Sequence, residues 1–290
     1  MCFIPGLLPE SRSVQCEVKS ALFAMATFIL TRPPIITISR VARPPGERTL
    51  VELLYKDEYF IAVNKPSGFH VHPHENVQHR VSRDKICLYH ARRMMKQHVY
   101  PVHRLDAGTS GVLLFALSSE SASKLCRLFT ERATHKTYQA VVRGFVKEEG
   151  EVQLPLELDS TGDLVDAHTS FKRLATVEFP VAVGKKFPTA RYSWVEVTPH
   201  TGRYHQIRRH FNRISHPLLG DAVHGDSHHN RFFRNHLEIE GLCLKALRLE
   251  FTHPWSGEKV SIEAPPCDKW KKIQLLFDPA LPLEGKLKSL

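Results

Sequence analysis

The sequence predicts a mixed α+β fold. Strand-like segments run through most of the chain, and three amphipathic segments near residues 85–96, 119–132 and 205–214 have the spacing of helices. The composition is that of a globular protein, with 42% hydrophobic and 24% charged residues. Because 290 residues suffice to bury a substantial core, we expect one large domain over residues 49–275, with an N-terminal extension and a C-terminal tail at 276–290.

The charge balance indicates a polyanionic partner. The chain carries 40 Lys and Arg residues against 30 Asp and Glu residues, which gives a formal net charge of +10 and a pI near 9.4. This excess favours nucleic acid or an acidic membrane surface as the partner and says nothing about the fold. The six cysteines are scattered without a Cys-x-x-Cys pair, which favours reduced thiols in a cytoplasmic protein over a disulfide framework or a zinc ribbon.

Residues 1–48 are predicted to be an N-terminal extension. Its apolar run at 21–30 is far shorter than the ~20 residues that a membrane span needs. Glu10 and Glu17 leave no net positive segment before that run, so we expect neither a secretory signal nor a membrane anchor. Two interpretations stay open: an irregular arm with a weak targeting function, or sequence upstream of a true start at Met25. Within the extension, residues 35–38 predict a short strand between two Pro-Pro pairs.

The next elements are two strands, predicted at 53–55 and 59–63 and joined by a charged turn. The run Asn64-Lys65-Pro66-Ser67-Gly68 ends the second strand and by itself indicates a Pro-Gly turn. It is followed by three histidines at alternate positions, a spacing that places three imidazoles on one side of a strand and suits zinc: His70, His72 and His74. No cysteine lies nearby, and 18 histidines make such clusters common, so we expect no metal there.

A basic segment follows, with seven Lys and Arg side chains against one acid over residues 80–104. The part around 88–95 is predicted to be helical, so that Arg92 and Arg93 belong to a basic stripe. A charge run is usually a solvated face. Because this one lies directly upstream of the segment described next, in a basic protein, we favour contacts with phosphate groups.

Residues 102–111 are the most informative segment. They place one carboxylate, Asp106, two residues after Arg104 and directly ahead of a turn made of Gly, Thr and Ser. The apolar run 112–117 behind the turn predicts a fully buried strand. If the segment before the turn is extended, alternate residues share a face, and Arg104 and Asp106 point the same way. The residues of this segment alone leave two interpretations level: a functional carboxylate beside a cation, or an aspartate that caps a turn.

The remaining elements follow from periodicity. Apolar residues at i, i+3, i+4 and i+7 within 118–132 predict an amphipathic helix that serines cap. In the helix near 205–214, Ile207 and Phe211 mark the packed side, so that Arg208 and Arg209 turn another way. Further strands are predicted at 136–144, 175–179, 191–197 and 259–262.

Three motifs occur in order along the chain: His-Arg-Leu-Asp-x-x-Thr-Ser-Gly from His103, Lys-x-Tyr ending at Tyr138, and Thr-Gly-Arg-x-His-Gln-Ile-Arg-x-His from Thr201. Together with the Asn-Lys-Pro-x-Gly run, they resemble the signature of the RluA-type pseudouridine synthases. The resemblance implies that Asp106 is the essential aspartate, Tyr138 the active-site tyrosine and Arg208 the arginine that pairs with the aspartate. It also implies a curved, mixed, mainly antiparallel β-sheet with a central cleft and flanking helices.

Within that family the chain is more similar to the bacterial tRNA pseudouridine synthase C subfamily than to the large-subunit rRNA enzymes, through Arg208-Arg209-His210, residues 220–226 and Asn230-Arg231. This implies tRNA as the substrate, at uridine 65 in tRNA numbering, where the T stem meets the acceptor stem. An rRNA synthase and a catalytically silent RNA-binding relative are the alternatives, and a zinc hydrolase is more remote. Leu244-Lys245-Ala246 departs from the Leu-His-Ala usual in the family, which bears on the substrate more than on the chemistry.

The implied reaction is an intramolecular isomerisation, so we expect no cofactor and no metal; the sequence holds no Gly-rich dinucleotide or phosphate loop. A cation such as Arg208 favours the ionised form of a carboxylate beside it. A base inside a duplex must flip out, and Arg104 is the candidate to fill the space it leaves. We expect a monomer that binds tRNA and needs no protein partner and no membrane. The predicted RNA-binding or base-flipping residues are His103, Arg104, Arg92, Arg93, Arg203, His205 and Arg209.

Overall fold

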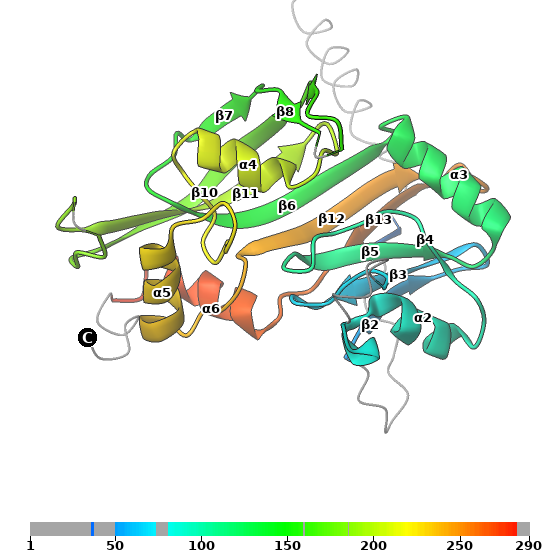
Figure 1. The fold of residues 1–290 in the computed structure, drawn as a ribbon. Helices are drawn as coiled ribbons and strands as arrows, with labels where there is room; N and C mark the ends of the chain where they lie inside the picture. The colour runs from blue at the N-terminus through cyan, green and yellow to red at the C-terminus, as the bar shows by residue number, and fades with distance from the viewer. Residues whose placement is uncertain (1–35, 38–49, 74–80, 159, 185, 283–290) are drawn as a thin grey trace, which may run out of the picture. The chain divides into compact units, whose positions relative to one another are not determined.

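A mixed, mainly antiparallel β-sheet organises the fold (Figure 1). The computed structural model describes residues 36–37, 50–73, 81–158, 160–184 and 186–282. Their strands are β1 (Ile36–Thr37), β2 (Glu52–Lys56), β3 (Phe60–Lys65), β4 (Tyr100–Pro101), β5 (Ser110–Ala116), β6 (Thr134–Arg143), β7 (Glu149–Val152), β8 (Leu156–Glu157), β9 (Leu164–Val165), β10 (Thr169–Phe179), β11 (Ala190–Pro199), β12 (Leu244–Thr252) and β13 (Lys259–Glu263).

Eleven of these strands join one sheet, whose main path runs β2-β3-β5-β12-β6-β11-β10-β7. β4 pairs with β5, β13 pairs with β12 and β1, and β8 and β9 form a separate two-stranded sheet. The pairs β5–β12 and β1–β13 are parallel, and the others are antiparallel. The predicted α+β class with a mainly antiparallel sheet is confirmed.

The three predicted helices are confirmed, as α2 (Cys87–Met95), α3 (Ser119–Thr130) and α4 (Gln206–Arg213). A short 3₁₀ turn, η2 (Arg83–Lys85), precedes α2. The Ser118 hydroxyl caps α3 by accepting a hydrogen bond from the Ser121 amide at 3.0 Å. Two further helices, α5 (Ser227–His236) and α6 (Asp268–Leu276), were not predicted. The buried residues of α5, Phe232 and Phe233, are adjacent in sequence and do not show the helical spacing.

The apolar run after Asp106 is the strand β5, and all seven of its residues are buried. Both faces of the strand are covered, which explains why the sequence does not alternate. Val112 and Leu114 pack in one core cluster with Leu125 of α3, whereas Leu113 and Phe115 pack in another with residues of α2. The central strand is therefore held from two sides, and the loop before it starts from a rigid base.

The predicted short strand near residues 35–38 is confirmed as β1, which pairs with Val260 and Ser261 of β13. The rest of the predicted extension, 1–35 and 38–48, lies outside the described residues. At the other end, α6 contributes Trp270, Ile273 and Leu276 to a core cluster with β10 and β11, and Phe277 packs with them. Among the described helices, none has the length and apolar character that a bilayer crossing requires.

Candidate active site

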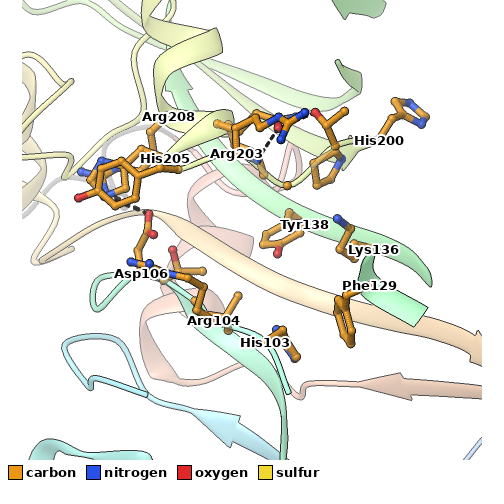
Figure 2. Close-up of a pocket in the computed structure, with 18 of the residues that line it drawn as sticks. His103, Arg104, Asp106, Phe129, Lys136, Tyr138, His200, Arg203, His205 and Arg208 are labelled. Carbon is orange, nitrogen blue, oxygen red and sulfur yellow. Dashed lines mark hydrogen bonds and ion pairs between the residues drawn. The ribbon is translucent and has the colours of Figure 1, made fainter. Parts of the chain in front are cut away.

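A cavity of about 660 Å³ opens beside Asp106 (Figure 2). Its walls come from the loop between β4 and β5, from α3, from β6 and from the segment 199–208 that leads into α4. Asp106 is the only carboxylate among the described residues that line it. The lining cations are Arg104, Arg132, Lys136, Arg203 and Arg208, joined by His103, His200 and His205. The cavity is thus a basic chamber with one acid.

The loop that carries Asp106 is held by hydrogen bonds to its backbone. The Thr109 amide donates to the Asp106 carbonyl at 3.0 Å and closes the turn. Lys65, whose side chain is fully buried, donates to the carbonyls of Ala107 at 2.9 Å and of Phe69, and Ser67 donates to that of Gly108 at 2.7 Å. The Asn-Lys-Pro-Ser-Gly run therefore forms a turn and, in addition, holds the Asp106 loop through hydrogen bonds.

Gly111 explains why a glycine ends the turn. Its φ of +116° is a backbone conformation that favours glycine, and a Cβ at this position would lie 2.0 Å from the Ala246 carbonyl oxygen. β5 and β12 run parallel here with Gly111 opposite Ala246. The missing side chain lets the two strands approach, and the loop ahead of Gly111 is set against β12.

Asp106 is paired with Arg208, as the motifs implied. Arg208 Nη1 donates to Asp106 Oδ2 at 3.0 Å, although the two residues lie 102 positions apart in the chain. The same guanidinium binds Asp221 through Nε at 2.7 Å and Nη2 at 2.8 Å. Burial acts to raise the pKa of Asp221, but its hydrogen bonds with Arg208 and with two backbone amides outweigh burial and lower it. Asp221 thus stays ionised and holds Arg208 in place.

Two histidines stand beside this pair. His205 Nε2 lies 3.6 Å from Asp106 Oδ2, beyond hydrogen-bond distance, while its Nδ1 lies 3.1 Å from His224 Nε2. Burial lowers the pKa of both His205 and His224, so both rings are neutral at pH 7 and one donates to the other. His205 therefore lies beside Asp106 at the cavity wall, and its role as an RNA contact stays a prediction.

Tyr204 is an exposed aromatic residue that lines the cavity. Its ring stacks on His205 with the centroids 3.7 Å apart, and the Arg104 guanidinium lies over the Tyr204 ring, 5.6 Å from its centroid. Tyr204 keeps 45% of its surface exposed. It occupies the variable position of the third motif, so the motif itself gave no signal for it.

Tyr138 projects into the cavity from β6 (Figure 2). Burial raises its pKa, and the negative charge of Asp106 raises it further. The phenol is therefore protonated at neutral pH. Tyr138 pairs with Ala246 of β12 on one side and with Val197 of β11 on the other, so the two neighbouring strands position this ring.

Each predicted RNA-binding residue can now be placed. His103, Arg104, Arg203 and His205 line the cavity, whereas Arg92, Arg93 and Arg209 do not. His103 Nε2 accepts a hydrogen bond from the Leu114 amide at 3.1 Å, and burial lowers the pKa of His103 to about 4, so its ring is a neutral support for β5. Arg209 donates to the Glu157 carbonyl at 2.9 Å.

Of the three histidines of the zinc alternative, the structure describes His70 and His72. His72 Nδ1 lies 2.9 Å from the carbonyl oxygen of the neighbouring Pro73, and His74 lies outside the described residues. No group of three or more His, Cys, Asp or Glu side chains that could hold a metal ion is found in the part of the chain that the structure describes.

Lys245, the departure from the Leu-His-Ala pattern, points away from the cavity. Its neighbour Leu244 lines the cavity, and consecutive side chains of a strand alternate between faces. Lys245 is 3% exposed, and burial lowers its pKa to about 8. This substitution therefore changes the opposite face of β12 and leaves the chamber around Asp106 as it is.

Comparisons with known proteins agree with the motifs. Residues 59–213 match the family described as RNA pseudouridylate synthase. A protein of Vibrio parahaemolyticus named tRNA pseudouridine synthase C is 43% identical over 238 residues, covering 79% of this chain and 95% of its own length. A protein of the same name from Pasteurella multocida is 44% identical over 238 residues, covering 79% and 96%.

Solved structures show the same fold. Human RNA Pseudouridylate Synthase Domain Containing 1 superposes with a TM-score of 0.60 at 24% identity, over 77% of this chain and 86% of its own. Human RNA Pseudouridylate Synthase Domain Containing 4 gives a TM-score of 0.59 at 20% identity, over 78% and 92%. At these identities the likeness concerns the arrangement of strands and helices.

Proposed function

The chain belongs to the RNA pseudouridylate synthase family, whose members are isomerases that act on uridine in RNA, and from this we propose that it modifies tRNA at uridine 65, where the T stem meets the acceptor stem. Its relatives at 43% and 44% identity are named for tRNA. The observation that carries the proposal is the bond between Asp106 and Arg208 inside a basic cavity with no second carboxylate among its described lining residues.

The reaction needs an ionised carboxylate next to the ribose. The bond between N1 of the base and C1′ breaks, the base turns, C5 bonds to C1′ and gives up its proton, and N1 takes up a proton. Asp106 starts this sequence either by attacking C1′ or by taking the C2′ proton. In both routes the negative charge is required, and the Arg208 guanidinium at 3.0 Å stabilises it.

Tyr138 is proposed to hold the detached base and to assist the loss of the C5 proton. An aromatic ring suits the first task because base stacking is worth about 1–3 kcal/mol. For the second task its phenol must first give up its own proton, which burial and Asp106 oppose in the free enzyme. Tyr138 is therefore proposed to stack on the detached base and to take the C5 proton as its phenol passes its own proton to solvent.

Arg104 is proposed to enter the RNA helix when the target base leaves it. Unstacking a base costs a few kcal/mol, and a side chain that fills the gap offsets part of that cost. Arg104 is exposed, lines the cavity and lies over the Tyr204 ring without a carboxylate partner among the described residues. It is therefore available to RNA from a defined starting position.

The test is to map pseudouridine across total RNA from cells with and without the gene, and in tRNA treated with the purified protein. We expect a single tRNA position at the T-stem and acceptor-stem junction to lose the modification and to regain it in vitro. Loss confined to rRNA would favour an rRNA synthase. An unchanged map, with RNA still bound by the protein, would favour a silent RNA-binding relative.

A further inference from the structure

Lys136 is a cation at the cavity wall for which the described residues supply no counterion. It lies on β6 two residues before Tyr138, and in Figure 2 Tyr138 lies between Asp106 and Lys136. Among the described residues no carboxylate forms an ion pair with it. The one carboxylate of the described lining, Asp106, is already bound by Arg208.

The position of Lys136 follows from the strand. Residues i and i+2 of a strand face the same side, so Lys136 and Tyr138 both reach the cavity. Their Cα atoms are separated by about 6.6 Å, from two residues at 3.3 Å each. That offset is comparable with the length of one sugar–phosphate unit. A nucleotide whose base stacks on Tyr138 would bring its neighbouring phosphodiester to the Lys136 end.

The electrostatics of this end favour an anion. Burial lowers the pKa of Lys136, and the positive charge of Arg132 lowers it further. Arg132 and Arg203 line the same chamber, and His200 lies there as a neutral ring whose pKa burial lowers. Lys136 is partly buried, and an ammonium group that loses part of its hydration costs free energy unless it is paired. Nothing among the described residues offsets that cost in the free state, which suits a site that receives its counterion with the substrate.

We propose that Lys136, with Arg132 beside it, binds the phosphodiester next to the target uridine. The inference rests on the proposed function, because it takes RNA as the ligand and Tyr138 as the contact of the flipped base. A compact ammonium with three donors matches a phosphate oxygen, whereas the uracil ring is neutral. The cavity, at about 660 Å³, lies in the size range that buries a whole small ligand and has room for a nucleoside and a flanking phosphate.

The experiment pairs one protein change with one RNA change. Lys136→Met keeps the buried stem and removes the charge, and Lys136→Arg restores a cation. The RNA is a synthetic tRNA minihelix in which single linkages on either side of the target uridine are replaced, one at a time, by neutral methylphosphonates. Lys172→Met is the matched control, because Lys172 is exposed, pairs with Glu149 and lies outside the cavity.

We expect Lys136→Met to raise KM and the Kd for RNA by about 10- to 100-fold, with kcat within about twofold, and Lys136→Arg to recover most of the affinity. The slope of log K against log salt should fall by about 0.7–0.9, the value for one phosphate. The methylphosphonate at the linkage that Lys136 contacts should weaken RNA binding by the wild type by a similar factor and leave RNA binding by Lys136→Met unchanged. A methylphosphonate at any other linkage should affect RNA binding by the two proteins equally. Lys172→Met should match the wild type throughout.

Two results would overturn the inference: a loss of kcat at unchanged KM, which would place Lys136 in the proton transfers, or equal sensitivity of wild type and Lys136→Met to every methylphosphonate. If the wild type forms no pseudouridine in any RNA, the proposed function fails, and the same comparison made by RNA affinity alone still decides the phosphate contact. Should Lys136→Met unfold, Lys136→Gln takes its place in the same series.

Discussion

Asp221 grips the Arg208 guanidinium with both carboxylate oxygens, at 2.7 and 2.8 Å, while the remaining Nη1 of Arg208 reaches Asp106 at 3.0 Å. Asp221 in turn accepts hydrogen bonds from the Val223 and His224 amides, each at 2.9 Å. Arg208 is therefore fixed before any RNA arrives. Electrostatic groups that need no reorganisation during the reaction contribute most to catalysis. Asp221, the residue that fixes Arg208, does not itself line the cavity.

Asp106→Asn should abolish isomerisation, because the amide keeps the shape but loses the charge and basicity that the reaction uses. RNA affinity should stay within about twofold of the wild type, since it comes mainly from the basic surface. The fold should also persist, because Asp221 still satisfies Arg208. Tritium release from C5-labelled RNA, RNA affinity and Tm are measured together. Substantial residual turnover would support the turn-capping interpretation of Asp106, since Asn caps about as well as Asp.

Asp221→Asn should lower both activity and stability. Removing one partner of a buried ion pair costs on the order of 3 kcal/mol, and Asp221 is only 2% exposed. The difference from wild type should depend on pH. Because the folded-state pKa of Asp221 is lowered from 3.8, its contribution is complete above about pH 5 and is lost as the pH falls through the folded value. Urea unfolding of both proteins from pH 7 to pH 3 tests this, and a constant difference would contradict it.

Tyr138→Phe should separate stacking from proton transfer. The phenyl ring still stacks on the detached base, so RNA affinity should be nearly unchanged. Without the hydroxyl, kcat should fall by about 10²–10⁴, the usual contribution of a positioned acid or base. Single-turnover tritium release, compared with binding by filter retention, gives both quantities. Full activity of Tyr138→Phe would assign the residue to stacking alone, and Tyr138→Leu then serves to remove the ring.

Tyr204→Ala should weaken RNA binding by about 5- to 150-fold, the equivalent of one base–aromatic stack of about 1–3 kcal/mol. Its ring is exposed at the cavity and already stacked on His205. Tyr204→Phe should bind as the wild type does, because the face of the ring is retained. The measurement is the Kd for the tRNA minihelix at fixed salt. Equal weakening by Ala and Phe would point to the hydroxyl and not to stacking.

Replacing Arg92 and Arg93 together with Ala should flatten the salt dependence of RNA binding by roughly 0.7–0.9 in log–log slope for each phosphate that the variant no longer neutralises. Turnover at saturating RNA should change little, because neither residue lines the cavity. Both lie on α2, so RNA bound there would extend the footprint beyond the chamber. An unchanged slope would show α2 to be a solvated helix face.

Much of the fold was predictable because local patterns encode it. The uninterrupted apolar run of β5 and the spacing of Leu125 and its neighbours in α3 indicated the central strand and its covering helix. The helix α5 escaped prediction because its apolar residues are two adjacent phenylalanines in a polar segment. Its burial comes from a core cluster shared with β10, β11 and α6, which no local window contains.

The site residues also fall into two groups, those that sequence motifs indicated and those that only tertiary contacts reveal. Asp106, Tyr138 and Arg208 came from motifs, and their mutual geometry joins residues far apart in the chain. Lys65 and Asp221 were visible only as parts of a turn and of a subfamily segment, because a charged side chain is ordinarily taken to be exposed. What makes each of them structural is its burial against specific carbonyls or a specific guanidinium. That property arises from tertiary contacts and leaves no periodic trace.

The support of the Asp106 loop has a consequence for how the protein is made. Ser67, which donates to the Gly108 carbonyl, lies 3.4 Å from Lys269 Nζ, and that ammonium also donates to the Leu242 carbonyl at 2.8 Å. Ser67 and Lys269 are 202 positions apart. During synthesis the Asp106 loop is therefore made well before Lys269, the most distant residue in sequence that supports it. The contacts that support the loop are complete only when α6 is in place, because Lys269 belongs to that helix.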